Sequence, residues 1–121
     1  ETKEFPLPKQ NLSTDAGPWT FTLTRDGEPP EGTFETAINL DAVDGDLKLT
    51  IPRGEEKLDL PGGGRKTVHD CLREAGVPEP LRLFAAGISD AKGVLWLPGI
   101  RQNARVSAPG RRKLTIRARV K

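Results

Sequence analysis

Apolar and polar residues alternate along most of the chain after residue 18, and this alternation predicts β-strands. Trp19, Phe21 and Leu23 alternate with threonines, which is the period-two pattern of a strand with one buried face. The same pattern predicts strands over residues 34–40, 47–51 and 114–120 and a brief extended piece over 58–60, and the apolar run 94–97 predicts a buried strand. Short alternating runs of this kind favour an antiparallel meander with one solvent-exposed face.

One helix interrupts this pattern. Thr67 is placed to cap its N-terminus and Gly76 to end it. The apolar residues between them follow the helical spacing i, i+3, i+4 and i+7, at Val68, Cys71, Leu72 and Ala75. The pattern also allows a second short helix over residues 81–86. We therefore predict an α+β fold, a small and mostly antiparallel sheet with one or two short helices.

The first 18 residues contain three prolines and little periodicity. They predict a linker or irregular N-terminal segment, 1–18, ahead of a single domain, 19–121. At 121 residues the chain is long enough to bury one core without disulfides or a structural metal. It contains no methionine, so we expect it to be part of a longer protein.

The rare residue types limit the chemistry that this chain can perform. The single cysteine, Cys71, and the single histidine, His69, exclude an internal disulfide and a cysteine-built zinc cluster. They point in divergent directions on the predicted helix, so they cannot act together as base and nucleophile. We expect Cys71 to be a buried core thiol, and we predict no catalytic residue and no metal in this chain.

Two features bear on where the protein resides. The absence of paired cysteines fits a cytoplasmic protein. The longest uncharged apolar stretch, residues 83–88, is far too short to span a bilayer, so no membrane partner is expected.

Charge is distributed unevenly, although the formal net charge is only +2. Residues 1–46 carry ten acidic and three basic side chains, whereas residues 99–121 carry eight basic and no acidic ones. A one-sided basic segment of this kind is typical of a surface that binds polyanions. A solvated strand whose charges keep the protein soluble fits the composition equally well.

A glycine-rich turn precedes the helix in the stretch PGGGRKTVHDCLREAGVP, residues 61–78. A phosphate-binding P-loop requires G-x-x-x-x-G-K-[ST], but its two glycines would fall at Leu60 and Arg65. The G-x-G-x-x-G pattern of dinucleotide-binding folds is also missing, so no nucleotide cofactor is expected. Arg65 and Lys66 stand just before a helix N-terminus, which favours anions. A phosphodiester backbone and a free phosphate would suit this position equally.

Several motifs follow one another in a fixed order, RGEEKLDLPGGGRKTVHDCLREAGVP, then LR, then GVLWLPGIRQNAR, with FETAINLDAV upstream. Their order and spacing resemble the C-terminal domain of bacterial tRNA(Ile)-lysidine synthetases, most strongly over residues 34–106. The matched positions are Arg53, the glycines Gly62, Gly63 and Gly64, then Lys66, Asp70, Val77, Pro78 and Arg82, and finally Trp96, Pro98, Gly99 and Arg101 of the family's W-V-P-G-x-R.

The chain also departs from the family pattern. Residues 55–57 are Glu-Glu-Lys where the family has a G-D-R-like turn, and Thr67 and His69 replace two lysines near the start of the helix. A proline expected after the downstream arginine is absent. The first two changes lower the local positive charge, for which Arg65 is placed to compensate.

The resemblance implies a supporting role in tRNA modification. In the family, an N-terminal ATP-pyrophosphatase domain with an S-G-G-x-D-S loop uses ATP and magnesium to adenylate the wobble cytidine of tRNA(Ile), whose anticodon is CAU. Lysine then displaces AMP, and the product is lysidine. No such loop occurs in these 121 residues. This chain is therefore expected to bind the tRNA toward its acceptor stem, beside the parent's catalytic domain and without a cofactor of its own.

A duplex stem is recognised mainly through its backbone and shape, so basic side chains are the candidate contacts. We predict RNA contacts for Arg53, Arg65, Lys66, Arg82, Arg101, Arg105, Arg111 and Arg112, and close backbone approach of phosphates at Gly62, Gly63 and Gly64.

Two other functions remain open on the sequence alone. A protein–protein or dimerisation module is favoured by Trp19, Trp96 and the acidic N-terminal half. A purely structural module of a cytoplasmic protein would contact no RNA. Whether the parent protein is a homodimer is also left open.

Overall fold

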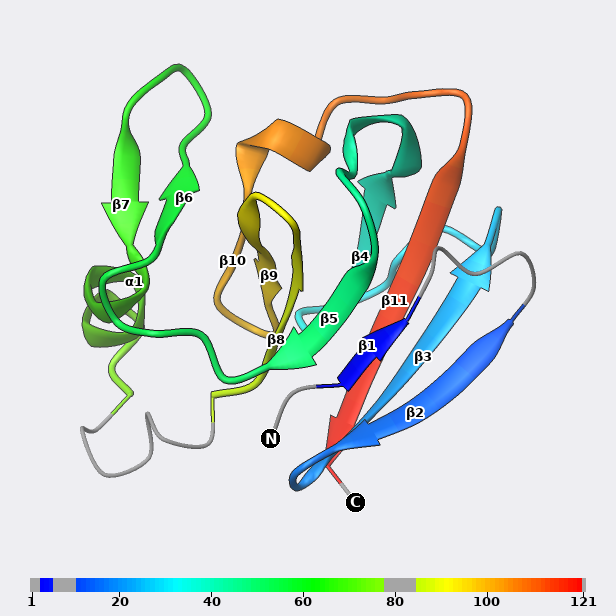
Figure 1. Cartoon of the computed structure of the whole chain (residues 1–121), viewed down its shortest axis with the longest axis horizontal. Coiled ribbons are helices and arrows are strands. Elements are labelled where there is room, and N and C mark those ends of the chain that lie inside the picture. The colour runs from blue at the N-terminus through cyan, green and yellow to red at the C-terminus, as the bar shows by residue number, and fades with distance from the viewer. Residues whose placement is uncertain (1–2, 6–10, 78–84, 121) are drawn as a thin grey trace.

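The computed structural model describes residues 3–5, 11–77 and 85–120, whose strands form three antiparallel sheets (Figure 1). The four-stranded sheet has the order β2-β3-β11-β4, with β2 at Leu12–Ala16, β3 at Trp19–Arg25, β4 at Glu35–Asn39 and β11 at Lys113–Val120. The five-stranded sheet has the order β1-β5-β8-β9-β10, with β1 at Lys3–Phe5, β5 at Leu47–Thr50, β8 at Gly87–Asp90, β9 at Gly93–Leu97 and β10 at Arg101–Gln102.

The remaining elements are short. Strands β6 at Lys57–Asp59 and β7 at Arg65–Thr67 form a hairpin, which leads into the helix α1 at Val68–Glu74. Two 3-10 turns, η1 at Leu40–Ala42 and η2 at Ala104–Val106, follow strands β4 and β10. The predicted α+β fold, mostly antiparallel and with few short helices, is confirmed.

The predicted meander is wrong. Strand β11 lies between β3 and β4 and pairs with both, and β5 belongs to the other sheet. An alternating sequence specifies which face of a strand is buried, but it does not specify the neighbouring strand. The neighbour of β3 and β4 comes from the far end of the chain, where no turn signal links it to them.

The main core lies between the four-stranded and five-stranded sheets. Phe21 and Leu23 of β3 and Ile116 of β11 are fully buried against Leu49 of β5 and against Trp96 of β9. The rings of Phe21 and Trp96 meet edge to face with centroids 6.4 Å apart. Aromatic and aliphatic side chains from both sheets therefore fill one shared interior, which is how two sheets stabilise each other.

A second, smaller core lies under the hairpin and α1. Its buried members are Leu58, Val68, Cys71, Leu72, Val94 and Leu97. Strand β9 contributes to both cores, because Leu95 and Trp96 belong to the first. This double burial explains the uninterrupted apolar run 94–97 and confirms that it is a buried strand.

The helix begins as predicted and ends earlier. The Thr67 hydroxyl oxygen accepts a hydrogen bond from the Asp70 amide at 3.1 Å, which caps the N-terminus. Cys71 is a buried thiol, as predicted. Ala75, expected on the apolar face, is exposed, because the helix ends at Glu74 and Gly76 follows with φ of +77°.

Part of the predicted second helix lies outside the described residues. Residues 81–84 belong to that part, and the described Ala85 and Ala86 are not helical. None of the helices in the described portion is long and apolar enough to cross a membrane.

The N-terminal segment, expected to be irregular, contains two strands. Both lie at sheet edges, β1 beside β5 and β2 beside β3. In β2 the inward positions are occupied by Leu12, Thr14 and Ala16, which face residues 19–23 of β3. Apart from Leu12, the side chains of this edge strand are small or polar, so the sequence shows no clear alternation there.

Candidate nucleic-acid interface

A groove of about 680 Å³ lies between the five-stranded sheet and the hairpin. We call it the basic groove, since five basic side chains line it, namely Lys48, Arg53, Lys57, Arg65 and Lys92. They come from strand β5, the loop that follows it, the two hairpin strands and the turn between β8 and β9. The fold thus gathers cations that are up to 44 residues apart in the sequence.

The pleat of the hairpin decides which of its cations face the groove. Leu58 and Lys66 are directly opposite each other, and Leu58 points into the smaller core. Lys57 and Arg65 occupy the alternate positions and therefore lie on the opposite face of the hairpin. Lys66 extends instead to helix α1, where its ammonium group pairs with Glu74.

The glycine-rich stretch forms the turn of this hairpin. Gly62, Gly63 and Gly64 have φ values of +84°, +109° and +83°, a region that favours glycine. The Leu60 amide donates to the Gly64 carbonyl at 3.0 Å and closes the turn. Gly63 and Gly64 also line a shallower hollow of about 430 Å³, which adjoins the basic groove at Arg65.

The groove cations differ in their ion pairs. Arg53 pairs with Glu55 at 3.2 Å and Arg65 with Asp59 at 3.3 Å; the Asp59 side chain is partly exposed and the other three are largely exposed. Exposed pairs of this kind contribute little free energy, so an incoming anion can compete for both arginines. The three lysines of the groove, Lys48, Lys57 and Lys92, make no ion pair within the described part of the chain.

Asp90, a carboxylate that borders the groove, is paired with an arginine of the protein itself. Both oxygens of Asp90 accept hydrogen bonds from the Arg105 guanidinium, each at 2.9 Å. Burial alone would raise the pKa of Asp90, but the bonds from Arg105 and from the Asp44 and Lys92 amides outweigh it and hold that pKa below its ordinary value. Glu56, the other carboxylate of the groove, accepts from the Arg53 amide at 2.8 Å. The groove therefore has a net positive charge, to which its three lysines contribute most.

The structure brings only some of the predicted RNA contacts together. Arg53 and Arg65 lie in the basic groove, and Gly63, Gly64 and Arg105 line the adjoining hollow. The guanidinium of Arg105, however, is held by Asp90 and by the Ala42 carbonyl, to which it donates at 3.2 Å. The positive charge of Arg105 is therefore already compensated by Asp90 within the protein.

The other predicted contacts lie elsewhere. Arg101 is beside the buried thiol of Cys71, where its charge opposes the increase in pKa that burial causes. Arg112 pairs with Asp41 at 2.8 Å, and the Arg111 amide donates to the same carboxylate at 3.0 Å. Arg82 lies outside the described residues.

Sequence reasoning missed the three lysines. Lys48 occupies a polar position of an alternating run, Lys57 ends the Glu-Glu-Lys turn, and Lys92 stands in a tight turn. Only the Lys57 position carried a signal, because it replaces the last residue of the family's G-D-R-like turn. Within the described residues no group of three or more potential metal-ligating side chains is placed to hold an ion.

Comparison with known proteins establishes the fold. Among solved structures, this chain is similar to the crystal structure of the TilS C-terminal domain, with a TM-score of 0.76 over 99% of this chain and 98% of that one. This chain has the TilS C-terminal domain fold. The identity between the two is 21%, and the resemblance inferred from the sequence motifs, those of lysidine synthetase (TilS), is confirmed at the level of the fold. No protein-family model and no curated protein matches the sequence.

The TilS-like W-V-P-G-x-R segment is mainly structural here. Trp96 is 3% exposed in the main core, and Pro98 is also buried. Gly99 lies against the ring of Phe34, so closely that an added Cβ atom would collide with it. Of the matched positions in this segment, Arg101 alone carries a charge, and it lies beside the smaller core.

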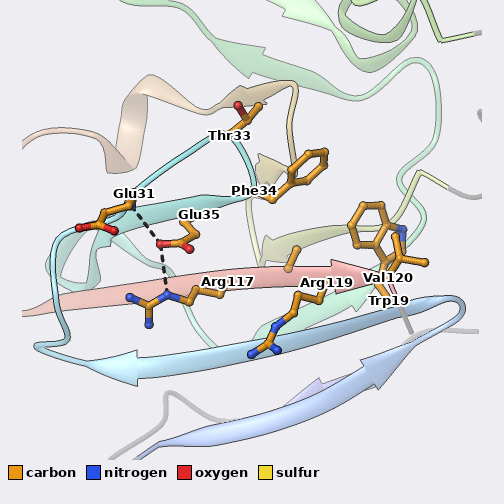
Figure 2. Close-up of a pocket in the computed structure, with 9 residues that line it drawn as sticks. Trp19, Glu31, Thr33, Phe34, Glu35, Arg117, Arg119 and Val120 are labelled. Atoms are coloured by element: carbon orange, nitrogen blue, oxygen red, sulfur yellow. Dashed lines mark hydrogen bonds and ion pairs between the residues drawn. The ribbon is translucent and has the colours of Figure 1, made fainter.

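A second hollow of about 590 Å³ lies at the end of the TilS-like four-stranded sheet (Figure 2). Figure 2 shows Trp19, Phe34 and Val120 on one side and the Arg117–Glu35 ion pair on the other. Phe34 and Val120 are 48% and 68% exposed. The Glu31 amide, together with Arg117, holds the pKa of Glu35 below its ordinary value, so the charge of this arginine is compensated and the surface is chiefly apolar.

Proposed function

We propose that this domain binds tRNA and positions it for a lysidine-forming ligase of which it is the C-terminal part. The observation that carries the proposal is the basic groove, where three lysines have no carboxylate partner among the described residues. Phosphate contacts supply most of the sequence-independent affinity for nucleic acids, and a duplex stem offers its backbone rather than its base edges. The fold of the TilS C-terminal domain supports the same function.

Under this proposal the chemistry belongs to the parent protein. Its catalytic domain would bind ATP with magnesium and join lysine to the wobble cytidine of tRNA(Ile) in the cytoplasm. The domain described here would supply affinity and orientation. Its contacts would be Lys48, Lys57 and Lys92, together with Arg53 and Arg65 once phosphates displace Glu55 and Asp59 from their exposed ion pairs.

Removing the three groove lysines tests the proposal. In the variant K48A/K57A/K92A we expect weaker tRNA binding and a log–log salt dependence that is shallower by roughly two to three units, because each lost phosphate contact removes roughly 0.9 of a unit on duplex DNA. The measurement is fluorescence anisotropy with labelled tRNA at several salt concentrations.

The matched control is R73A/K113A/R119A, which removes the same charge from positions outside the groove. It should keep most of the affinity and slope. Equal losses in the two triple variants would mean that net charge, not the groove, determines binding. Undetectable binding by the unmodified domain at low salt would refute the RNA-binding function itself.

The hollow in Figure 2 favours a second candidate function, a protein contact such as a homodimer. The apolar side chains Phe34 and Val120 are exposed beside Trp19, and exposed apolar groups in contact with one another often mark protein interfaces. Trp96, which had also suggested such a contact, is buried in the core and cannot take part.

Sedimentation over a range of concentrations tests this second function. If the hollow is a homodimer contact, the domain should dimerise, and F34A/V120S should shift the equilibrium to monomer by removing apolar area. The control T20A changes a half-buried position of the same sheet that does not line the hollow. A protein that remains monomeric at every concentration would contradict the dimer.

A further inference from the structure

The wall of the basic groove contains a buried hydroxyl group that has no hydrogen-bond partner among the residues that the structure describes. This is the Oγ of Ser89, a residue that lines the groove and is 5% exposed. Buried polar atoms are nearly always hydrogen-bonded, so an exception of this kind calls for a ligand or another explanation. The strand register shifts between Ile88 and Ser89, at an irregularity typical of a β-bulge, and bulges commonly redirect a side chain beside a functional site.

The register also places this hydroxyl among the groove lysines. Ser89 of β8 is directly opposite Lys48 of β5, so both side chains lie on the same face of the sheet. Lys92 follows in the turn that closes β8 and β9, and Lys57 lines the groove from the hairpin side. An anion seated here would meet three ammonium groups and one hydroxyl donor.

The amount of charge indicates what kind of anion fits. Five cations border the groove, but Arg53 and Arg65 are paired with Glu55 and Asp59, and Glu56 also lines it, so its net charge is about +2 while Asp90 is paired with Arg105. One phosphodiester carries a single negative charge and would leave one positive charge uncompensated. A phosphate monoester carries roughly −1.5 to −2 at neutral pH and has three strong acceptor oxygens, so it can accept from several of these donors at once.

We infer that the basic groove binds a terminal phosphate monoester of an RNA, with the Ser89 hydroxyl and the ammonium groups of Lys48, Lys57 and Lys92 as its donors. The inference rests on the proposed RNA-binding function and adds the end of the strand as the preferred ligand. The Ser89 Oγ lies beneath the groove surface, and the lysine side chains around it are long enough to rotate as the anion enters.

The test compares RNA hairpins of one sequence that carry a 5′-phosphate, a 3′-phosphate or only hydroxyl ends. We expect a terminal phosphate to tighten binding to this domain by roughly tenfold in an anisotropy assay, which corresponds to one or two charge-assisted hydrogen bonds. Whichever phosphorylated end gives the gain identifies the source. Inorganic phosphate at millimolar concentration should compete for the gain, since it offers the same oxygens.

Two variants locate the effect. S89A removes the orphaned hydroxyl and K92A removes a cation from an exposed turn, and each should abolish most of the gain from the terminal phosphate. R119A, outside the groove, should keep it. Circular dichroism checks that S89A is folded, and K92A provides the same test at a site where folding is not at risk.

The outcomes separate this inference from the function on which it rests. Equal binding of phosphorylated and hydroxyl-ended hairpins would overturn the inference, while salt-dependent binding of both would still support an RNA-binding function. A gain that survives in both S89A and K92A would also overturn it, because the terminal phosphate would then bind elsewhere. Failure of the domain to bind any of the hairpins would reject both proposals.

Discussion

Replacing Asp90 with alanine should lower the free energy of unfolding by roughly 3 kcal/mol, the low end of the range for breaking a buried ion pair. The Asp90 side chain is fully buried, and its oxygens accept from Arg105 and from the Asp44 and Lys92 amides. The variant would leave the Arg105 guanidinium, on a side chain that is only 20% exposed, without a carboxylate, and two amides without their acceptor. Urea unfolding of D90A against the unmodified domain measures the loss.

The matched control for D90A is D41A, which removes a carboxylate with similar partners from an exposed position. Asp41 likewise accepts from an arginine side chain, that of Arg112, and from two backbone amides, but its side chain is 40% exposed. Water can replace the lost contacts there, so D41A should be much less destabilising than D90A. Adding R105M to D90A should recover part of the loss, because the unpaired buried charge is then gone. Comparable losses in D41A and D90A would contradict this account.

The same pair predicts how stability depends on pH. The pKa of Asp90 is lower in the folded protein than its ordinary value of 3.8, so its contribution is fully present above that value and is lost as the pH falls through the folded pKa. Below about pH 4 the stability of the unmodified domain should therefore fall more steeply than that of D90A. Parallel acid-unfolding curves would show that Asp90 has no such role.

The Asp90–Arg105 pair also shows what could not be predicted from the sequence. Arg105 belongs to the basic C-terminal segment, and its charge alone suggested a contact with a polyanion. Its partner is 15 residues away, across strands β9 and β10, and no local pattern links them. Charge density along a chain gives the number of cations, whereas folding decides which of them remain available to a ligand.

The elements themselves were more predictable than their arrangement. Alternation located β3, β4, β5 and β11, an apolar run located β9, and the cap at Thr67 located the start of α1. These features depend on neighbours within a few residues. The position of β11 between β3 and β4 depends on contacts across most of the chain. The basic groove depends on the same long-range pairing, which is why three of its lysines escaped notice.

Strand ends explain the remaining errors in the predicted core. Phe34, Ile51 and Val120 continue the alternation of their strands, yet they are 48%, 45% and 68% exposed. Phe34 lies just before β4, Ile51 just after β5, and Val120 is the last residue of β11. At a strand end that extends past the facing sheet, a side chain on the inner face has no residues of the other sheet to pack against, so it stays exposed. Two of these residues instead line the hollow of Figure 2.

Phe21 and Phe34 provide a direct test of this distinction. Phe21 is fully buried, and its ring meets those of Trp96 and Trp19 with centroids 6.4 and 6.3 Å apart. Because Phe21 belongs to one sheet and Trp96 to the other, F21A should open a cavity between the sheets and cost about 4 kcal/mol of unfolding free energy. Urea unfolding, with an unchanged dependence on urea concentration, would give this value.

The variant F34A removes the same atoms from a site that is almost half exposed. The ring of Phe34 contacts Trp19 and Gly99 at the rim, so its loss should cost less than half as much as that of Phe21. Equal losses would mean that the two sheets are not held together mainly by the interior around Phe21. Lys48, Ser89 and Lys92 of the groove lie on the sheet opposite β3. If the proposed RNA-binding function holds, F21A should therefore also bind RNA less tightly, whereas F34A should bind it as the unmodified domain does.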